Sequence, residues 1–412
     1  MPLVFLASYS VEKSVKGYLA SMLFLQTAML GTLLALDVFL FYIFWELMLA
    51  PMYFIIGIWG GIRRIYASLK FVLYTVVGSL LMLVAIFYVV REHYFQTGAY
   101  SFLISDLLNT NFSINQELCL YAAFALAFGI KVPIFPFHTW LPDAHVEAPT
   151  GGSVVLAGVL LKMGIYGFLR FAYPLFPRAA MEFAPFIALL AVVGIVYGAL
   201  VAWAQTDIKK LIAYSSVSHL GYCVLGLVAF NVLSTTGSIF QMLSHGLTTG
   251  GLFLLVGVLY DRKHTRLISD YSGLASKVPV FAFLFLIFTL GSIALPLTSG
   301  FVGEFMILLG SFDTFPYFTA FSVLGVVLGA VYMLVLYRKC MFGELNEKNN
   351  DLTDINKREV SILIPLVIFI FYLGIYPSTF TKRIEPSVKN YLDVVETRID
   401  SLNNQQKGEL NE

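Results

Sequence analysis

The chain has 412 residues, of which 58% are hydrophobic and only 12% charged, and its net charge is +1. Soluble domains carry about a quarter charged residues, so water is not the main solvent of this chain, and its near-neutral charge argues against nucleic acid as a partner. The three cysteines are far apart and no GxGxxG or GxxxxGK[ST] motif occurs, so a disulfide framework, a cysteine metal cluster and a nucleotide site within this chain have no support. The composition predicts an all-α polytopic protein of the lipid bilayer.

Apolar segments long enough to cross a bilayer, about 20 residues each, occur eleven times. These expected spans cover 17–36, 38–60, 65–90, 117–137, 150–173, 183–204, 210–230, 237–260, 278–311, 316–338 and 360–376. Three hydrophilic stretches remain. The first, 91–116, has room for a short surface helix. The second, 339–359, is a loop, and the tail from 377 to 412 is amphipathic or disordered.

Basic residues in the short loops indicate the orientation, because Lys and Arg accumulate on the cytoplasmic side. One side of the predicted bundle carries Lys13, Lys16, Arg63, Arg64, Lys209, Lys210, Arg262, Lys263, Arg266, Lys277, Arg338 and Lys339. The other side has mainly Arg91 and Arg178 before the tail. Residues 10–16 are therefore expected in the cytoplasm, or in the matrix of a mitochondrion, with the tail on the opposite side.

Six titratable residues fall inside the expected spans, where a charge costs roughly 2.5–3.5 kcal/mol on insertion scales. They are Glu46, Lys131, Lys162, His219, His245 and Glu304. Lys70 and Arg170 lie near span ends, and we expect their long side chains to reach the interface. The interior charges fit either a structural ion pair, such as Glu46 with Lys131, or a path for protons or cations.

Lysine, glutamate and histidine suit protons in particular. Burial disfavours a charged lysine while a nearby carboxylate favours it, so a lysine between these influences changes protonation when its partner moves. Arginine stays protonated and could not act in this way. Histidine titrates near neutral pH. A lone helical histidine is more often a satisfied core residue, so both interpretations stay open for His219 and His245.

Two spans contain helix breakers beside these charges. In "KVPIFPFHTWLP" (131–142), Pro133 and Pro136 follow Lys131, and in "SIALPLTSGFVGEF" (292–305) Pro296 precedes Glu304. Proline removes a backbone donor, and broken backbone is tolerated in a membrane only when it is buried in protein or lines water. Because the breaks fall in spans four and nine, they indicate two inverted five-helix repeats, each with one discontinuous helix.

The expected division of the chain follows from these repeats. The first repeat covers 17–173 and the second 183–338, followed by the loop 339–359, one extra helix at 360–376 and the polar tail 377–412. In and just before the stretch "PDAHVEAP" (142–149), His138, Asp143, His145 and Glu147 invite a metal site. Their irregular spacing near a membrane boundary, without an HExxH motif, favours a loop at a water inlet or a polar cap on the broken helix.

Four stretches resemble the antiporter-like subunits of the proton-pumping NADH–quinone oxidoreductase, respiratory complex I. They are "FWELMLAPMYFIIGIWGG" (44–61), "KVPIFPFHTWLPDAHVEAPTGGSVVLAGVLLKMGIYGFLRF" (131–171), "DIKKLIAYSSVSHLGY" (207–222) and "SGFVGEFMILLGSF" (299–312). The resemblance runs from about residue 17 to 376. Glu304, where sibling subunits usually carry lysine, and the first stretch favour the M type, which is the mitochondrial subunit 4 type.

The resemblance implies a role for each interior charge. Glu46 would pair with Lys131 of the broken helix, Lys162 would be the central lysine, and Glu304 the terminal group toward the exit or a neighbouring subunit. His219 and His245 would belong to the hydrated axis between Lys162 and Glu304. The family usually has fourteen helices against eleven here, so residues 1–16 are expected to be the remnant of a preceding helix, with the first three helices truncated or supplied by another chain.

The resemblance further implies that this chain performs no redox chemistry and holds no cofactor. FMN, iron–sulfur clusters and quinone would lie elsewhere in the complex, and quinone reduction would drive proton movement through this subunit. Its partners would be other membrane-arm subunits, in the bacterial plasma membrane or the mitochondrial inner membrane. The alternatives are a subunit of a cation/proton antiporter or membrane-bound hydrogenase of the same superfamily, and a structural spacer with vestigial charges.

Overall fold

The computed structural model describes the backbone of residues 1–409 and the side chains of residues 1–402. The first half begins with a short N-terminal helix and continues into five membrane-crossing segments, several of them interrupted. Its helices are α1 (Pro2–Ala7), α2 (Val15–Leu34), α3 (Val38–Leu47), α4 (Leu49–Trp59), α5 (Arg64–Thr97), α6 (Ile104–Leu107), α7 (Ile114–Lys131), α8 (Trp140–Glu147), α9 (Thr150–Val155), α10 (Leu161–Gly167) and α11 (Tyr173–Leu175).

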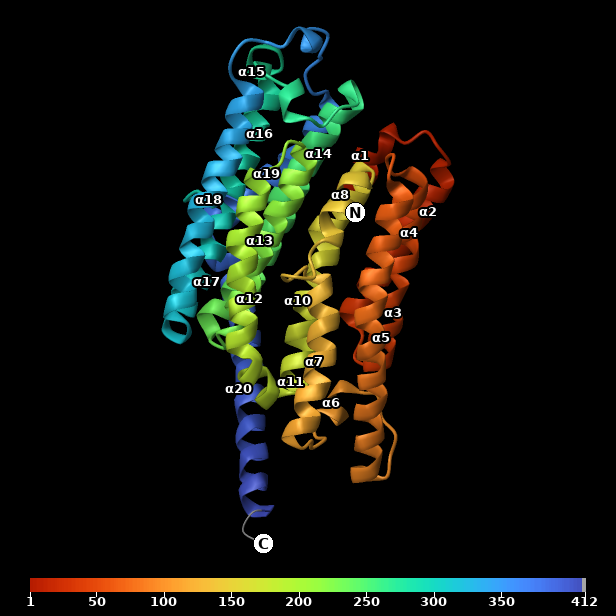
Figure 1. The fold of residues 1–412 in the computed structure, drawn as a ribbon, viewed down its shortest axis with the longest axis vertical. Coiled ribbons are helices and arrows are strands. Elements are labelled where there is room, and N and C mark those ends of the chain that lie inside the picture. Colours follow the sequence, from red (N-terminus) through yellow and green to blue (C-terminus); the bar gives the residue numbers. More distant parts are fainter. Residues whose placement is uncertain (410–412) are drawn as a thin grey trace.

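The second half lies beside the first half (Figure 1). Its helices are α12 (Pro177–Trp203), α13 (Ile208–Val228), α14 (Val232–Lys263), α15 (Leu274–Lys277), α16 (Pro279–Ser292), α17 (Ser299–Thr314), α18 (Pro316–Met341), α19 (Lys357–Ile375) and α20 (Ser378–Glu409). The expected tail thus forms the helix α20, which buries Val388 and Val395 against the bundle. The expected surface helix is α6, a single turn.

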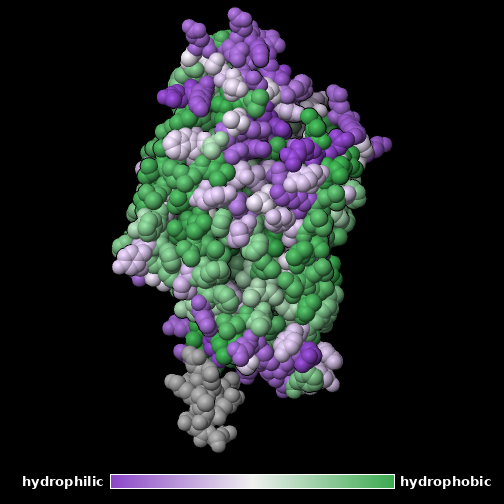
Figure 2. Space-filling model, in the orientation of Figure 1, coloured by the Kyte–Doolittle hydropathy of each residue, from purple (hydrophilic) through white to green (hydrophobic). Residues whose placement is uncertain are grey.

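The surface carries a broad apolar band between two polar ends (Figure 2). Within the described residues, nine helical segments are long and apolar enough to cross a membrane. The discontinuous pairs α7–α8 and α16–α17 complete the eleven spans that the sequence predicts. The chain is therefore a multi-pass helical membrane protein. We call the end of the bundle that carries Lys13, Arg64 and Lys263 the basic end.

Both predicted breaks are present. The first discontinuous helix stops at Lys131 and resumes at Trp140, and the second stops at Ser292 and resumes at Ser299. The expectation for 138–149 was wrong in one respect: most of this stretch is the helix α8, not a boundary loop, and His145 on it is fully buried. The polar and proline residues that suggested a loop instead form a short half-helix, in which Asp143 and Glu147 have hydrogen-bond partners and the His145 ring does not.

A hexapeptide repeat marks the two inverted halves. "SFLISD" (101–106) and "TRLISD" (265–270) each form an isolated β-bridge with the residue before a helix, Leu103 with Asp37 and Leu267 with Asp207. The bridge partners Asp37 and Asp207 each cap the helix that follows them, by accepting hydrogen bonds from two backbone N–H groups. The two copies lie at opposite ends of the bundle, near α6 and near α15 (Figure 1). Matched elements at opposite ends are what inverted repeats produce.

Candidate functional site: a row of buried titratable groups

Lys162 occupies a helix that is distorted on both sides. The span from Thr150 to Leu175 contains two π-helical turns, Leu156–Leu160 and Phe168–Ala172, and Lys162 lies between them on α10. Its Nζ donates to the carbonyl oxygen of Ala157 and lies 2.6 Å from Nδ1 of His245 on α14. Because π-helical turns place an extra residue in a helix and occur often at functional sites, this local irregularity positions the lysine.

His219 and Glu304 continue the row from His245. The His219 and His245 ring centroids are 5.8 Å apart, and His219 Nδ1 lies 2.9 Å from Glu304 Oε1. Gln241 donates to the same carboxylate oxygen at 2.9 Å. Four groups from four helices, Lys162, His245, His219 and Glu304, therefore form a nearly continuous chain through the protein interior.

Lys131 ends α7 and is almost completely buried, with 1% of its surface exposed. Its Nζ lies 4.9 Å from the ring centroid of Trp45 and has no hydrogen-bond partner among the described residues. The Glu46 carboxylate, on α3, interacts with the Ser79 hydroxyl and electrostatically with Lys131. The structure therefore makes the two residues neighbours without a direct hydrogen bond between them, so a small displacement of either would change their interaction strongly.

The helices that carry the two lysines are in direct contact. A Cβ added at Gly164, two residues after Lys162, would lie 2.6 Å from the Phe128 carbonyl oxygen and 2.6 Å from a methyl group of Val132. Only glycine allows this close approach between α10 and the last turn of α7. The packing therefore brings the backbone around Lys162 against the backbone around Lys131.

Two further titratable groups lie near this row, and the sequence did not predict that they are buried there. His145 stacks on Phe253 with 4.5 Å between ring centroids, and both of its ring nitrogens are buried without a hydrogen-bond partner among the described residues. It interacts electrostatically with Lys162 and with Lys209. Lys209 is 7% exposed and donates to the Ala148 carbonyl. Lys209 is the second residue of α13 and is followed by Lys210. A pair of lysines at the start of a helix gave no sign that one of them is buried.

Lys70 was expected to reach the membrane interface, and the structure adds a partly exposed partner for it, Asp143. Its Nζ lies 2.7 Å from Asp143 Oδ2 on α8, which ties α5 to the broken helix. Arg170 is exposed, in agreement with the expectation for a side chain at a span end. Groups of three or more metal-ligating side chains do not occur in the part of the chain that the structure describes, and Cys119, Cys223 and Cys340 are separate free thiols.

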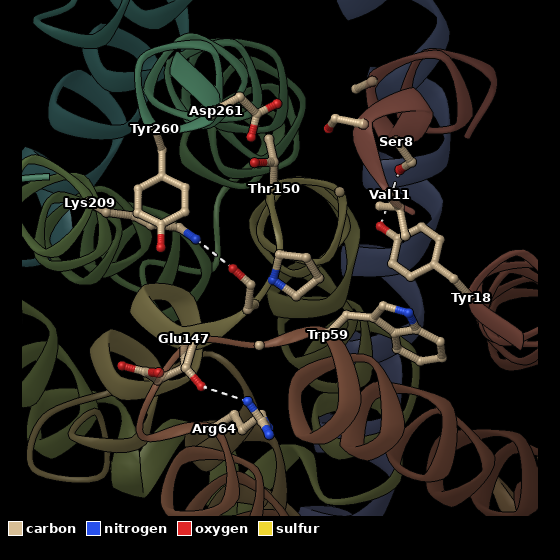
Figure 3. Close-up of a pocket in the computed structure, with 18 of the residues that line it drawn as sticks. Ser8, Val11, Tyr18, Trp59, Arg64, Glu147, Thr150, Lys209, Tyr260 and Asp261 are labelled. Carbon is tan, nitrogen blue, oxygen red and sulfur yellow. Dashed lines mark hydrogen bonds between the residues drawn. The ribbon is translucent and has the colours of Figure 1, made fainter. Parts of the chain in front are cut away.

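A cavity of about 370 Å³ opens at the basic end, beside the end of α8. Figure 3 shows Lys209, Tyr260 and Asp261 on one part of its wall and Glu147 and Arg64 on another. The cavity thus reaches from the surface to Lys209, which interacts with the buried His145. It is polar enough to hold water, which needs several polar partners in a confined site.

A multi-pass bundle with two discontinuous helices and an interior row of Lys, His and Glu defines a transport-type membrane protein. Residues 35–329 match the family described as NADH:quinone oxidoreductase/Mrp antiporter, TM, and the chain belongs to this family.

Two sequence relatives and one solved structure illustrate the similarity. The chain is 49% identical over 400 residues to the NADH-quinone oxidoreductase subunit M of Rhodobacter capsulatus, which covers 94% of this chain and 77% of the relative. It is 45% identical over 386 residues to the NADH-ubiquinone oxidoreductase chain 4 of Marchantia polymorpha, covering 93% and 76%. The structure of respiratory complex I from Thermus thermophilus with bound NADH contains a chain that resembles this one with a TM-score of 0.88 and 35% sequence identity. The match covers 95% of this chain and 82% of that chain.

Proposed function

We propose that this chain is a proton-translocating membrane-arm subunit of an NADH–quinone oxidoreductase. The observation that carries the proposal is the chain of contacts from Lys162 through His245 and His219 to Glu304. Each group can bind and release a proton. Two of the three links are at hydrogen-bonding distance, and the two imidazole centroids between them are 5.8 Å apart. The names of the relatives supply the enzyme to which such a subunit belongs.

In the proposed path, Lys162 passes a proton to Nδ1 of His245, because these atoms are already in contact. Transfer between the two imidazoles requires rotation of a ring or one bridging water, since their centroids are 5.8 Å apart. From His219 the proton reaches the Glu304 carboxylate, to which Gln241 also donates. Glu304 is then the last group of the row within this chain.

The Glu46–Lys131 pair would control this row. A carboxylate that approaches Lys131 favours its charged form, and one that withdraws favours release of the proton. Movement of Glu46 would thereby change the charge felt by Lys162 across the close α7–α10 contact. The energy would come from quinone reduction elsewhere in the complex, where the FMN, iron–sulfur clusters and quinone would also reside.

The cavity at the basic end is the proposed inlet for water and protons, and we place that end in the bacterial cytoplasm or the mitochondrial matrix. The membrane is accordingly the bacterial plasma membrane or the mitochondrial inner membrane. The partners are the neighbouring membrane-arm subunits. The division into repeats at 17–173 and 183–338 is part of the same proposal.

Proton pumping by membrane vesicles that contain the assembled complex tests this function. Lys131→Ala and Glu46→Ala should each abolish most NADH-driven acidification while the complex still assembles. Full acidification in both variants would reject the proposal. An assembly that instead exchanges sodium for protons, without NADH or quinone activity, would favour the antiporter alternative.

A further inference from the structure

The last turn of α8 is held by donors from four different segments. A helix leaves its final four carbonyls without helical partners, and in α8 these belong to residues 145–148. Their donors are Ser153 Oγ to His145 O at 3.0 Å, Arg266 Nη1 to Val146 O at 2.5 Å, Gly61 N to Glu147 O at 2.9 Å and Lys209 Nζ to Ala148 O at 2.6 Å. We call these four donors the α8 clamp.

Two members of the clamp are cations from the second repeat. Lys209 lies in the first turn of α13, and Arg266 precedes Leu267. Because Leu267 forms the β-bridge with Asp207, the residue before α13, both cations lie at the start of α13. Asp207 orients them, since it caps α13 and lies 3.2 Å from Nε of Arg266. Cations near the C-terminal end of a helix also interact favourably with its dipole. The second repeat therefore holds the broken helix of the first.

The first repeat contributes the other side of the contact. Gly61 N donates to the Glu147 carbonyl, and Arg63 N donates to Glu147 Oε2 at 2.9 Å. A Cβ at Gly61 would lie 2.7 Å from Glu147 Oε2, so a side chain at this position would displace the Glu147 carboxylate. The loop between α4 and α5 and the start of α13 thus meet at the end of α8.

The inverted copy of this arrangement lacks the cations. Counting from the capping aspartates, Lys209 matches Phe39, and Arg266 matches Phe102, the residue before the other β-bridge. Phe39 and Phe102 pack against each other with 5.6 Å between ring centroids. The repeat fold therefore forms without a lysine and an arginine at these positions. The two cations are not needed for the β-bridge, and in the second repeat both donate to α8 carbonyls.

The other end of α8 is tied to the turn that carries Lys131. Trp140 Nε1 donates to the Ile130 carbonyl at 2.9 Å. An isolated helix of eight residues is unstable, because nucleation is costly and few bonds follow it. The position of α8, and with it the buried His145, consequently depends on the contacts at its two ends.

We propose that Lys209 and Arg266 are positioning residues for proton translocation. They hold the last turn of α8 so that His145 stays near Lys162 and the Ile130–Lys131 turn stays in place, and they transmit movements between the two repeats. This inference rests on the proposed function for its effect on pumping, whereas the effect on α8 itself is independent of it.

Hydrogen–deuterium exchange of the assembled complex tests the effect on α8. In Lys209→Met and Arg266→Gln, the amides of residues 140–148 should exchange roughly tenfold faster, because each variant removes a charged donor from the helix end. Lys209→Arg keeps a donor and should stay close to the unmodified complex. Lys210→Met is the matched control, since that side chain makes no contact with the α8 carbonyls in the described structure. Unchanged exchange in both test variants would overturn the proposal.

Pumping measurements on the same preparations separate positioning from mere packing. We expect the number of protons moved per NADH oxidised to fall at least about twofold in Lys209→Met, while Lys209→Arg restores it. Faster exchange with unchanged stoichiometry would overturn the functional part. If Lys131→Ala pumps normally, the proposed function fails, yet the exchange data still decide whether the clamp holds α8. Should Lys209→Met not assemble, Lys209→Gln against Lys209→Arg provides the same comparison.

Discussion

Lys162 Nζ and His245 Nδ1 lie 2.6 Å apart, although they come from helices in different repeats. The contact joins the central lysine of the first repeat to the histidine pair of the second. It depends on the π-helical turn that precedes Lys162, because the amine also donates to Ala157 within that turn. The row of titratable groups is therefore assembled from both repeats and is incomplete in either one alone.

Removing the Lys162 amine should block proton transfer at the first group of the row. We expect Lys162→Met to reduce NADH-driven proton pumping to less than about a tenth, since a proton-transferring group typically contributes 10²–10⁴-fold. Acidification of vesicles, measured with a pH-sensitive dye, is the readout. Arg170→Met, on the same span but exposed, should pump normally. Normal pumping in Lys162→Met would contradict the role of this lysine.

Glu304 should tolerate neither loss of its charge nor reversal of its sign. Glu304→Gln keeps the size but removes the proton-binding carboxylate, and we expect pumping to fall at least about tenfold. Glu304→Lys would place a cation beside His219, 2.9 Å from the present carboxylate oxygen, and should impair pumping as severely. Glu304→Asp should retain part of the activity. Equal pumping by the Gln and Asp variants would argue against proton transfer at this position.

Lys131 should be dispensable for stability although it is needed for pumping. Its amine is buried without a hydrogen-bond partner among the described residues, and burial of such a group costs free energy. Lys131→Met, which keeps much of the volume, should therefore leave thermal stability unchanged or raise it, while pumping is lost. Lys131→Ala leaves a cavity and should be less stable than Lys131→Met. A large loss of stability in Lys131→Met would indicate a structural ion pair instead.

Glu117 is predicted to matter for stability and not for pumping. Its buried carboxylate accepts hydrogen bonds from the backbone N–H groups of Arg178 and Ala179 at the start of α12, and from Arg178 Nε at 2.8 Å. Glu117→Ala should cost about 3–5 kcal/mol, because one partner of a buried charged pair is removed. A thermal denaturation series measures this. Glu182→Ala, which removes an exposed carboxylate on α12, should have little effect.

The sequence predicts those features whose signals are local. Eleven apolar segments stand out by length, and charges such as Lys131 and Glu304 stand out because their surroundings are apolar. Prolines 133, 136 and 296 mark both breaks, which the structure confirms. The positions of His219 and His245 in the row agree with the resemblance, although their role in proton transfer stays a prediction.

The features that sequence reasoning missed depend on contacts between distant residues. Arg266 and Val146 are 120 positions apart, and no local pattern relates them. For the same reason the pairing of Lys70 with Asp143 was not expected. The repeat of "SFLISD" and "TRLISD" is different, because it is present in the sequence itself. A search for internal similarity would have located it.

An upside-down duplication has a consequence for direction. Two equal halves that face opposite sides of a membrane would, by symmetry, let protons run either way with the same ease. In this chain the aspartate caps and β-bridges occur in both halves, whereas the side chains around them differ. The replacement of an aromatic contact, Phe39 with Phe102, by Lys209 and Arg266 is one place where the two faces stop being equivalent.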